Sequence, residues 1–411
     1  MSEQSLFAYA SLLVEEAFDQ IIHDAIAAGA SDVYFQPNED NFTVAFRQYG
    51  VQRHVAELPS DIGRRLISHV KVVAGMDHAE RRRPQDGRQR YHAKLANTPP
   101  TARVDLRINT LPTMFGEDCT IRLLRRDFGP CELNALGMAN HDVNHALAMI
   151  YNPSGLILCT GPTGSGKTTT LYAFLKELNN GRRKINTIED PVEYTVEGVR
   201  QTQINPAIHL DFPELLRSVL RQSPDVILIG EIRDDTTAQV TVQAANSGHL
   251  VLSTLHSPVA VAAIQSMRGL HVHAQFLATA LTGVISQRLV RTLCHQCRKP
   301  VDIAQAPNAF SEIKQWLGPD EGHTLYAPIG CDACGQSGYR GQTGLFEVLH
   351  VSPAIRQLIS DGAPTAEIRR TAVKEGMLEF RQSALLNVAR GETSLEEVFR
   401  VVPSEYLVVQ D

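Results

Sequence analysis

The segment Gly161-Pro162-Thr163-Gly164-Ser165-Gly166-Lys167-Thr168 matches the pattern G-x-x-x-x-G-K-T of a phosphate-binding loop. Its glycines let successive backbone N–H groups turn inward on an anion, and Lys167 adds a positive charge. Thr168 supplies a hydroxyl for Mg²⁺, and Thr169 is the next residue expected to contact the nucleotide. The flanks agree, because residues 155–160 are typical of a buried strand and residues 167–178 predict a helix whose positive end points at the phosphates. We therefore predict a nucleotide site here rather than a merely glycine-rich turn.

The composition is that of an ordinary globular protein. Its 411 residues, 43% hydrophobic and 20% charged, are enough for two or three domains with a substantial core. A net charge of −6 gives no general attraction to nucleic acid or anionic lipid. No apolar run approaches the ~18 residues of a membrane span, and residues 1–20 contain no lysine or arginine, unlike a secretory signal. We expect a cytoplasmic protein that meets a membrane only through partners.

Four of the seven cysteines form two pairs with C-x-x-C spacing: Cys294 with Cys297, and Cys331 with Cys334. Two such pairs match the tetrahedral site that Zn²⁺ prefers, and four thiolates leave no open position for catalysis, so the site would be structural. A metal-free cysteine cluster is the alternative. The remaining cysteines stand among apolar neighbours and are predicted to be small core residues: Cys119, Cys131 and Cys159.

The pattern of apolar residues divides the chain into five stretches. Residues 1–125 mix a helix with short strands and predict a small α+β domain of PAS-like type. After a linker at 126–133, residues 134–290 alternate helices with fully apolar strands, which indicates a largely parallel α/β sheet and a RecA-like P-loop ATPase core. A tetracysteine zinc-binding subdomain (291–345) and a helical C-terminal subdomain (346–411) follow. The expected strands include 32–35, 42–47, 103–108, 119–124, 185–188, 226–229 and 250–253.

Carboxylates follow two of the core strands. Hydrolysis of a nucleotide needs a carboxylate that orients the attacking water and positive charge that stabilises the transition state. Glu231 ends a segment similar to Walker B, at the edge where parallel sheets bind ligands, and is the candidate for orienting the water. Glu189 and Glu193 would support water and metal from a second cluster. The usual Asp-Glu of Walker B is Gly230-Glu231 here, so Mg²⁺ would depend on the loop threonine, phosphates and water.

Two histidines, His249 and His256, bracket the strand 250–253. Either or both could approach the γ-phosphate and sense or stabilise it. The alternatives remain open at this point, since a histidine at a strand end is usually structural and a carboxylate cluster is often a solvated turn. The order of these segments after a sound phosphate loop favours the functional interpretation.

In this order, the segments resemble the ATPases of type II secretion and type IV pilus assembly (the GspE/PilB-type family). In that family they are called Walker A, Asp box, Walker B and His box. The paired cysteines, followed by residues 338–347, are similar to the family's zinc-binding insertion, which pilus retraction ATPases generally lack. Further landmarks of the family's N-terminal domain are similar to residues 29–32, 83–88, 104–107 and 116–117.

The resemblance implies a homo-hexamer that hydrolyses ATP between the RecA-like domain of one subunit and the N-terminal domain of its neighbour. Arginines of that domain would meet the phosphates, and Arg88 and Arg107 match best, with Arg122 third. It also implies an inner-membrane platform protein as partner, and hence a location at the inner face of the inner membrane. Tyr34 and Gln36 stand where relatives commonly have His and Glu, and the further N-terminal module of many relatives is missing, so recruitment is expected to differ.

We therefore interpret the chain as a hexameric ATPase, with ATP, Mg²⁺ and Zn²⁺ as cofactors, that drives assembly of a pilus or pseudopilus. A retraction ATPase of the same superfamily is disfavoured by the cysteines. A RecA-like nucleic-acid motor is disfavoured by the acidic charge and the ordered boxes, so no nucleic-acid partner is expected. A subunit that binds nucleotide without hydrolysing it is disfavoured by the intact Lys167, Thr168 and Glu231.

Overall fold

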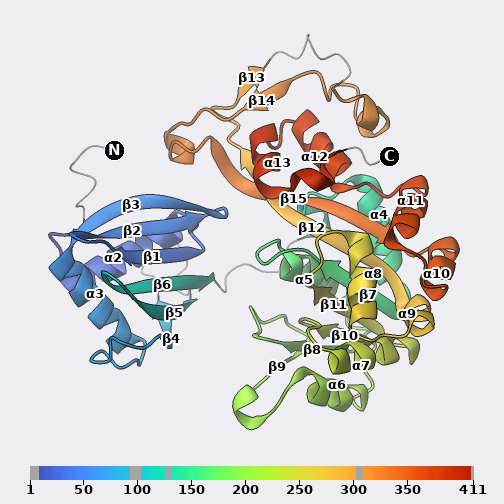
Figure 1. Cartoon of the computed structure of the whole chain (residues 1–411), viewed down its shortest axis with the longest axis horizontal. Helices are drawn as coiled ribbons and strands as arrows, with labels where there is room; N and C mark the ends of the chain where they lie inside the picture. Colours follow the sequence, from blue (N-terminus) through green and yellow to red (C-terminus); the bar gives the residue numbers. More distant parts are fainter. Residues whose placement is uncertain (1–8, 93–102, 126–131, 302–308, 409–411) are drawn as a thin grey trace. The chain divides into compact units, whose positions relative to one another are not determined.

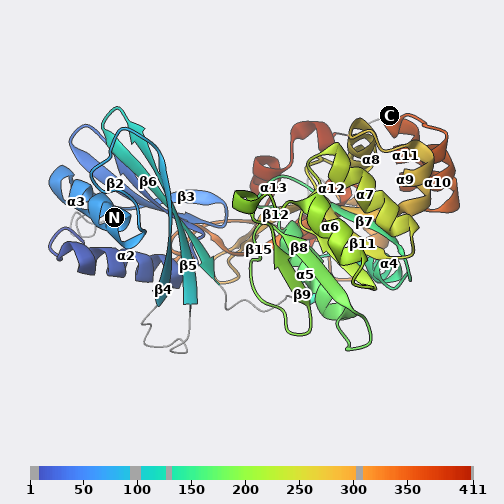
Figure 2. The ribbon, with the colours of Figure 1, turned by 90° about the horizontal axis from the view of Figure 1, so that it is seen from below.

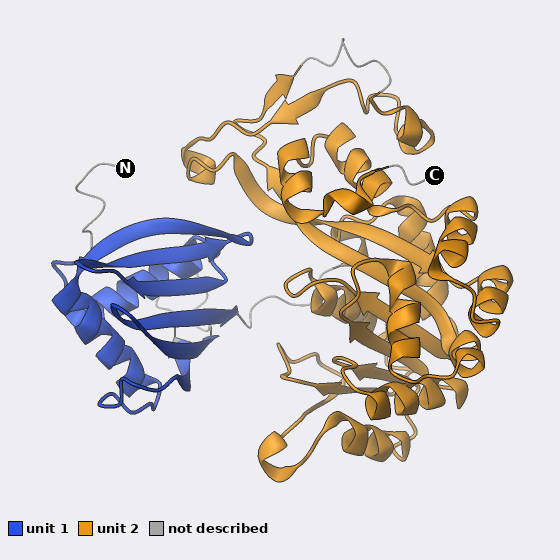
Figure 3. Cartoon of the chain, in the orientation of Figure 1, with its two compact units in different colours: residues 1–129 blue, residues 130–411 orange. Residues whose placement is uncertain are grey.

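The computed structural model describes residues 9–92, 103–125, 132–301 and 309–408. The chain divides into two compact units, residues 1–129 and 130–411 (Figure 3). The division falls inside the linker predicted at 126–133, most of which lies outside the described residues. Among the helices of the described stretches, none combines the length and the apolar character that crossing a membrane requires.

The first unit is built on a six-stranded antiparallel sheet with the order β3-β2-β1-β6-β5-β4 (Figure 1). Its strands are β1 (Asp32–Pro37), β2 (Asn41–Gln48), β3 (Val51–Pro59), β4 (Gln85–His92), β5 (Arg103–Thr113) and β6 (Gly116–Arg125). Side chains alternate between the two faces, as strand geometry requires. In β5, Val104, Leu106 and Ile108 are buried, whereas Arg107 and Asn109 belong to the opposite face.

Two helices, α2 (Val14–Ala27) and α3 (Ser60–Val73), cover the apolar face of this sheet (Figure 2). Apolar residues recur in α2 at intervals of three and four, so one stripe of the helix is buried. The stripe consists of Val14, Ala17, Phe18, Ile21, Ile22, Ala25 and Ile26. The opposite face of the sheet carries the polar side chains, and the predicted arginines are among them.

The second unit contains a seven-stranded sheet with the order β15-β12-β7-β11-β10-β8-β9. Its strands are β7 (Gly155–Thr160), β8 (Ile185–Glu189), β9 (Arg200–Gln203), β10 (Val226–Ile229), β11 (Leu250–Leu255), β12 (Leu281–Leu293) and β15 (Tyr339–His350). Neighbouring strands are parallel except for β12 and β15, which are antiparallel. The carboxyl ends of the parallel strands therefore meet at one edge.

Helices cover both faces of this sheet, so successive residues of its central strands pack into two different hydrophobic cores. In β7, Leu156 and Leu158 pack with helices α6 to α11, whereas Ile157 and Cys159 pack with α4 and α5. These helices are α4 (Asn140–Ile150), α5 (Lys167–Leu178), α6 (Phe212–Leu220), α7 (Asp235–Asn246), α8 (Ala260–Gly269), α9 (Ala274–Ala280), α10 (Pro353–Ser360) and α11 (Thr365–Lys374).

The C-terminal part adds a strand and a small separate core. Strand β15 spans the boundary predicted at 345/346 and belongs to the main sheet. Beyond it, α12 (Phe380–Ala389) and α13 (Leu395–Val401) pack with Val290 and Leu345 of the two outer strands. A two-stranded ribbon, β13 (Lys299–Val301) with β14 (Leu325–Ala327), lies between the two cysteine pairs in the chain.

The predicted fold class is confirmed: a small α+β unit precedes an α/β unit that carries a four-cysteine insertion. Helix α5 has the predicted bounds, and each of the expected strands is present. Two of the three remaining cysteines, Cys119 and Cys159, are buried as expected. The third, Cys131, lies outside the described residues.

Candidate functional site

The phosphate loop lies between the end of β7 and the start of α5. All three of its glycines, Gly161 (φ 140°), Gly164 (φ 76°) and Gly166 (φ 88°), have backbone angles that a side chain would strain. A Cβ atom on Gly161 would also lie 2.4 Å from the carbonyl oxygen of Gln287. Helix α5 begins at Lys167, directly after Gly166. Its first N–H groups have no acceptor inside the helix and therefore face the loop.

Lys167 lies over the backbone of its own loop. Its Nζ donates hydrogen bonds to the carbonyl oxygens of Gly161 (2.8 Å) and Pro162 (3.0 Å). Burial lowers the pKa of this amine, while the charges of Cys159 and Glu231 act in the opposite direction. The ammonium is thus close enough to Glu231 to respond to its charge. Of the other loop residues, Ser165 is buried, whereas the exposed ones are Pro162, Thr163, Gly164, Thr168 and Thr169.

Two contacts support the loop from neighbouring strands. Gln287 of β12 donates from Nε2 to the carbonyl oxygen of Ser165 (2.7 Å). At the end of β7, the Thr160 hydroxyl donates to the carbonyl of Ser257 (2.8 Å) and accepts from its N–H (2.7 Å). Gln287 was not predicted as a site residue, because it stands in a largely apolar strand distant in the chain and belongs to no spacing motif.

Glu231 follows β10 at the same edge of the sheet as the loop. Its side chain is 13% exposed, with Oε1 2.5 Å from the guanidinium of Arg233 and Oε2 3.8 Å from Nε2 of His256. The neighbouring Gly230 is also bonded to this edge, since its carbonyl accepts from the hydroxyl of Thr254 (2.6 Å). A half-buried carboxylate near Lys167 is thus flanked by two basic side chains.

Glu189 lies at the end of β8 and is buried, with only 3% exposed. Its Oε2 accepts from the hydroxyl of Tyr172, and its Oε1 accepts from Thr187 Oγ1 (2.6 Å) and Gln201 Nε2 (3.1 Å). Both oxygens are therefore occupied by donors of the chain itself. Glu193, four residues on, is half-buried. Tyr172 and Gln201 were not foreseen, because only folding brings α5 and β9 to the end of β8.

The two histidines lie at opposite ends of β11, which runs parallel to β7. His256 follows the strand and reaches Glu231. His249 precedes it, about 23 Å from His256 along the strand at ~3.3 Å per residue, and its Nδ1 lies 2.9 Å from the carbonyl oxygen of Ala244. Of the two histidines that could approach the γ-phosphate, the structure places His256 at the edge of the sheet that carries Glu231 and His249 at the opposite end of β11.

The predicted arginines are direct cross-strand neighbours in the first unit. Arg88 of β4 pairs with Arg107 of β5, which pairs in turn with Arg122 of β6. Paired residues of antiparallel strands extend from the same face, so the three form a line that we call the arginine row. The row borders a hollow of about 410 Å³ whose other lining residues include Asp86, Asn109 and Thr120.

The members of the arginine row differ in their partners. The Nε of Arg122 donates to Oδ1 of Asp32 (3.0 Å), whose side chain is only 5% exposed. Arg88 and Arg107 form no ion pair with any residue in the described stretches. Two of the three guanidinium groups are thus available to an anion, whereas the third is already neutralised.

The four paired cysteines meet at one point. Their sulfur atoms all lie within 4.8 Å of one another, and three of the Sγ–Sγ distances are 3.8 to 3.9 Å. Sulfurs bonded at ~2.3 Å to one tetrahedral Zn²⁺ would be ~3.8 Å apart, so the cluster fits zinc. Backbone N–H groups also point at the sulfurs: those of Gly330 and Gly338 contact Cys297 (3.4 Å) and Cys334 (3.2 Å). Burial raises the pKa of Cys334, but the N–H groups of Cys331 and Gly338 and the neighbouring thiols bring it down to about 6.

The chain matches one known protein family over nearly its whole length. The family model described as "Type II/IV secretion system protein" matches residues 9–400. The chain belongs to this family. The match covers both units of the structure and both cysteine pairs, and it confirms the resemblance seen in the sequence.

Similar members of the family have known names. The chain is 43% identical to the type II secretion system protein E of Dickeya dadantii over 94% of its own length and 75% of the relative's. It is 41% identical to the type II secretion system ATPase E of Vibrio cholerae (93% and 74%). It is also 41% identical to the type IV pilus assembly ATPase PilB of Pseudomonas aeruginosa (93% and 66%).

Solved structures show the same fold across greater sequence distance. The ATPase DotB of Legionella pneumophila superposes with a TM-score of 0.68 at 18% identity, over 94% of this chain and 95% of DotB. The pilus retraction motor PilT, solved with bound ADP, superposes with a TM-score of 0.59 at 24% identity, over 93% and 96%. These two proteins therefore share the fold of this chain.

Proposed function

We propose that this chain hydrolyses ATP and that the hydrolysis powers assembly of a type IV pilus or a type II secretion pseudopilus. The observation that carries the proposal is the meeting of the phosphate loop, Glu231 and His256 at one edge of the α/β sheet. Relatives at 41–43% identity are named for secretion and pilus assembly, whereas the retraction motor PilT resembles the chain at 24% identity. The cysteine cluster also favours assembly over retraction.

In this proposal the loop N–H groups and Lys167 bind the β- and γ-phosphates of ATP. Phosphate oxygens are stronger acceptors than the carbonyls of Gly161 and Pro162, so Lys167 would exchange those two hydrogen bonds for bonds to the nucleotide. The Thr168 hydroxyl, exposed in the first turn of α5, would ligate Mg²⁺. Because Gly230 offers no side chain, the other Mg²⁺ ligands would be phosphate oxygens and water.

Glu231 would orient the attacking water by accepting a hydrogen bond from it. His256, 3.8 Å from Glu231, would contact the γ-phosphate. Glu189 would act indirectly, because its two oxygens already accept bonds within the chain, and Glu193 would extend this supporting cluster. Hydrolysis also needs positive charge that stabilises the transition state. Arg88 and Arg107 of the arginine row, which form no ion pair in the described stretches, would supply it.

The arginines would act in a homo-hexamer, in which the first unit of one subunit faces the nucleotide of a neighbour. Residues 126–133 would link this ATPase-associated unit to the ATPase core. The hexamer would dock on an inner-membrane platform protein at the cytoplasmic face, and movement of the domains during hydrolysis would be passed to that partner. Such a role needs no transmembrane segment in the chain.

The cysteine cluster would hold a structural Zn²⁺ through Cys294, Cys297, Cys331 and Cys334. The metal would supply four bonds that join the end of β12 to the segment before β15 and would have no part in hydrolysis, since all four positions are filled by protein ligands. Metal binding of this kind contributes on the order of 10 kcal/mol to local folding in zinc-finger peptides. Release of zinc by a chelator should therefore destabilise the ends of β12 and β15 that the cysteines join, while the phosphate loop keeps its structure.

The test is Mg²⁺-dependent ATP turnover by the purified chain, beside Glu231→Gln, on samples sized by light scattering. Turnover by a hexamer that the substitution reduces by roughly 10²–10³-fold would support the proposal. Unchanged turnover in the variant would contradict the role given to Glu231 and would move it to the supporting cluster, where Glu193 would be the candidate. Failure to bind ATP at all would overturn the proposal.

A further inference from the structure

Arg88 lies on the edge strand of its sheet. Strand β4 has one neighbour, β5, in the described sheet, so its ladder positions it from one side only. The segment that leads into β4 comes from the end of α3 and runs through residues 74–84. How that segment is held therefore affects where Arg88 is presented beside Arg107.

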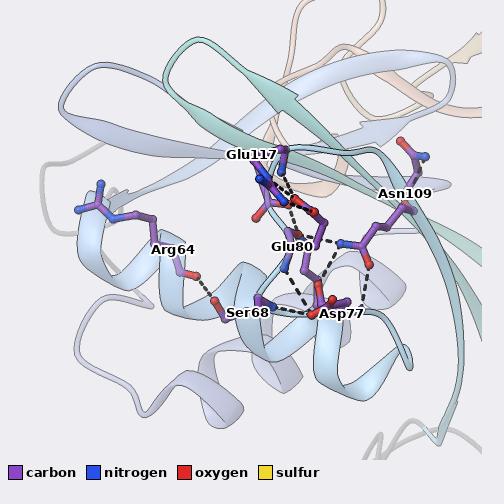
Figure 4. Close-up of polar contacts among 10 residues, drawn as sticks. Arg64, Ser68, Asp77, Glu80, Asn109 and Glu117 are labelled. Atoms are coloured by element: carbon purple, nitrogen blue, oxygen red, sulfur yellow. Dashed lines mark hydrogen bonds and ion pairs between the residues drawn. The ribbon is translucent and has the colours of Figure 1, made fainter.

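A buried lysine holds this segment. The side chain of Lys71, near the end of α3, is 0% exposed. Its Nζ donates to the carbonyl oxygen of Glu80 (2.7 Å) and to the carboxylate of Glu117 at the start of β6. Figure 4 shows the polar contacts around Glu80 and Glu117. A buried ammonium persists only with such partners, because its desolvation is costly, so Lys71 ties the segment firmly to α3 and β6.

Gln85, the first residue of β4, is hydrogen-bonded to the same carbonyl oxygen of Glu80. Gln85 donates from Nε2 to the carbonyl oxygens of Asp77 (2.9 Å) and Glu80 (2.9 Å), and its Oε1 accepts from the N–H of Asp77 (2.9 Å). The Glu80 carbonyl thus accepts from both Lys71 and Gln85. The buried ammonium is therefore one shared acceptor away from the start of the strand that carries Arg88.

Close packing and a cross-strand bond fix the next two residues. A Cβ atom on Gly87 would lie 2.5 Å from Met76 and 2.8 Å from Ala74, so β4 rests directly on the end of α3. Asp86 accepts from Asn109 of β5 (3.0 Å). The three residues before Arg88, namely Gln85, Asp86 and Gly87, are thus each held by contacts of their own.

We propose that Lys71 is a positioning residue for Arg88. Through the Glu80 carbonyl and Gln85, it sets the position of the edge strand and hence of the guanidinium beside Arg107. The inference rests on the proposed function, in which Arg88 meets the phosphates of a neighbouring subunit. Lys71 itself would touch no nucleotide, since its side chain is fully buried. A misplacement of about 1 Å can cost roughly 10²-fold in rate, which makes the positioning measurable.

The test is a double-mutant cycle on the full chain with ATP turnover as the readout. One arm is Arg88→Ala, and the other is the pair variant Lys71→Met/Glu117→Met, which removes both charges so that neither is left buried alone. Leu66→Ala, in the apolar core of the same helix and 0% exposed, is the matched control for lost stability. Unfolding temperatures and the separate values of kcat and KM are recorded for every variant.

We expect the pair variant to remain folded and to lose kcat by about tenfold to 10²-fold, while Leu66→Ala lowers the unfolding temperature without changing kcat. Arg88→Ala should then cost far less in the pair variant than in the wild type, because the arginine is already misplaced. Independent, multiplicative losses, or a normal kcat in the pair variant, would overturn the inference while leaving the role of Arg88 intact. An unchanged kcat in Arg88→Ala alone would instead overturn the role of Arg88, and this inference with it.

Discussion

The phosphate loop of the second unit and the arginine row of the first both present positive groups, but they are built in different ways. The loop is eight consecutive residues between one strand and one helix. The row takes one residue from each of three strands, and cross-strand register alone aligns them. Arg88 and Arg122 are 34 positions apart in the chain (122 − 88).

Because of this difference, substitutions elsewhere in the chain should affect the two sites unequally. In the loop, glycine conformations and the start of α5 position the N–H groups locally, so most of the geometry survives changes elsewhere. In the row, a shift of one residue in register would turn an arginine to the apolar face. The row should therefore be more sensitive to distant supports, such as the buried Lys71, than the loop is.

The largest expected effect is in the row. Arg107→Ala should lower kcat by roughly 10³-fold, as loss of an arginine finger does, because Arg107 has no competing ion pair in the described stretches. Arg122→Ala should cost less than about tenfold in kcat, since its guanidinium already pairs with Asp32, but it should lower the unfolding temperature. Steady-state turnover and thermal unfolding of both variants check this. Equal losses of kcat would show that the row acts as one unit.

The loop comes next. Lys167→Ala should reduce kcat/KM for ATP by about 10²–10³-fold, the usual cost of removing one positioned donor to developing charge. The fold should be unaffected, because the bonds of Lys167 are to the loop's own carbonyls. Lys176→Ala, further along the same helix, is the matched control and should turn over ATP normally. Retained turnover in Lys167→Ala would refute the assignment of the loop.

Stability of the second unit should depend on pH. Burial raises the pKa of both Asp142 and Glu347 to about 7, and for Glu347 the N–H groups of Ala260 and Phe380 oppose the shift. A carboxyl whose folded pKa is raised contributes stability below its unfolded pKa, near 4, and loses it as pH rises through 7. The unfolding temperature should therefore fall between about pH 4 and pH 7.

Asp142→Asn should reduce this fall, because it removes a loss in the free energy of unfolding of up to about 4 kcal/mol for a shift of about three pKa units. The single tryptophan, Trp316, lies in the second unit, so its fluorescence follows the unfolding of that unit. The same pH slope in wild type and variant would contradict the assignment to Asp142. Comparison with circular dichroism of the whole chain would separate the two units.

The smallest expected effect is at the support of the loop. Gln287→Ala removes one hydrogen bond to the Ser165 carbonyl, worth about 1 kcal/mol, and should raise KM for ATP about fivefold with little change in kcat. Gln357→Ala, which removes a surface bond to Asp361, is the control. A large loss of kcat in Gln287→Ala would mean that β12 contributes to the chemistry and not only to the position of the loop.

The predictable part of the site follows from local physics. A phosphate loop, its flanking strand and helix, and a C-x-x-C pair are each encoded in a few adjacent residues, because their geometry depends on backbone conformation and short spacing. The same holds for the apolar strands of the core, whose position in the sheet could be inferred from their composition. Glu231 could be placed because it directly follows such a strand.

The rest depended on long-range pairing. Only the tertiary structure showed that His249 lies far from the phosphate loop, since the direction and length of β11 set the distance between them. It also revealed Tyr172 and Gln201 around Glu189, Gln287 behind the loop and Lys71 beneath β4. The sequence by itself determined which elements form and which residues could bind phosphate or zinc, because those properties are local. The tertiary structure decided which side chains meet, because strand order and register bring distant residues together and no short segment specifies them.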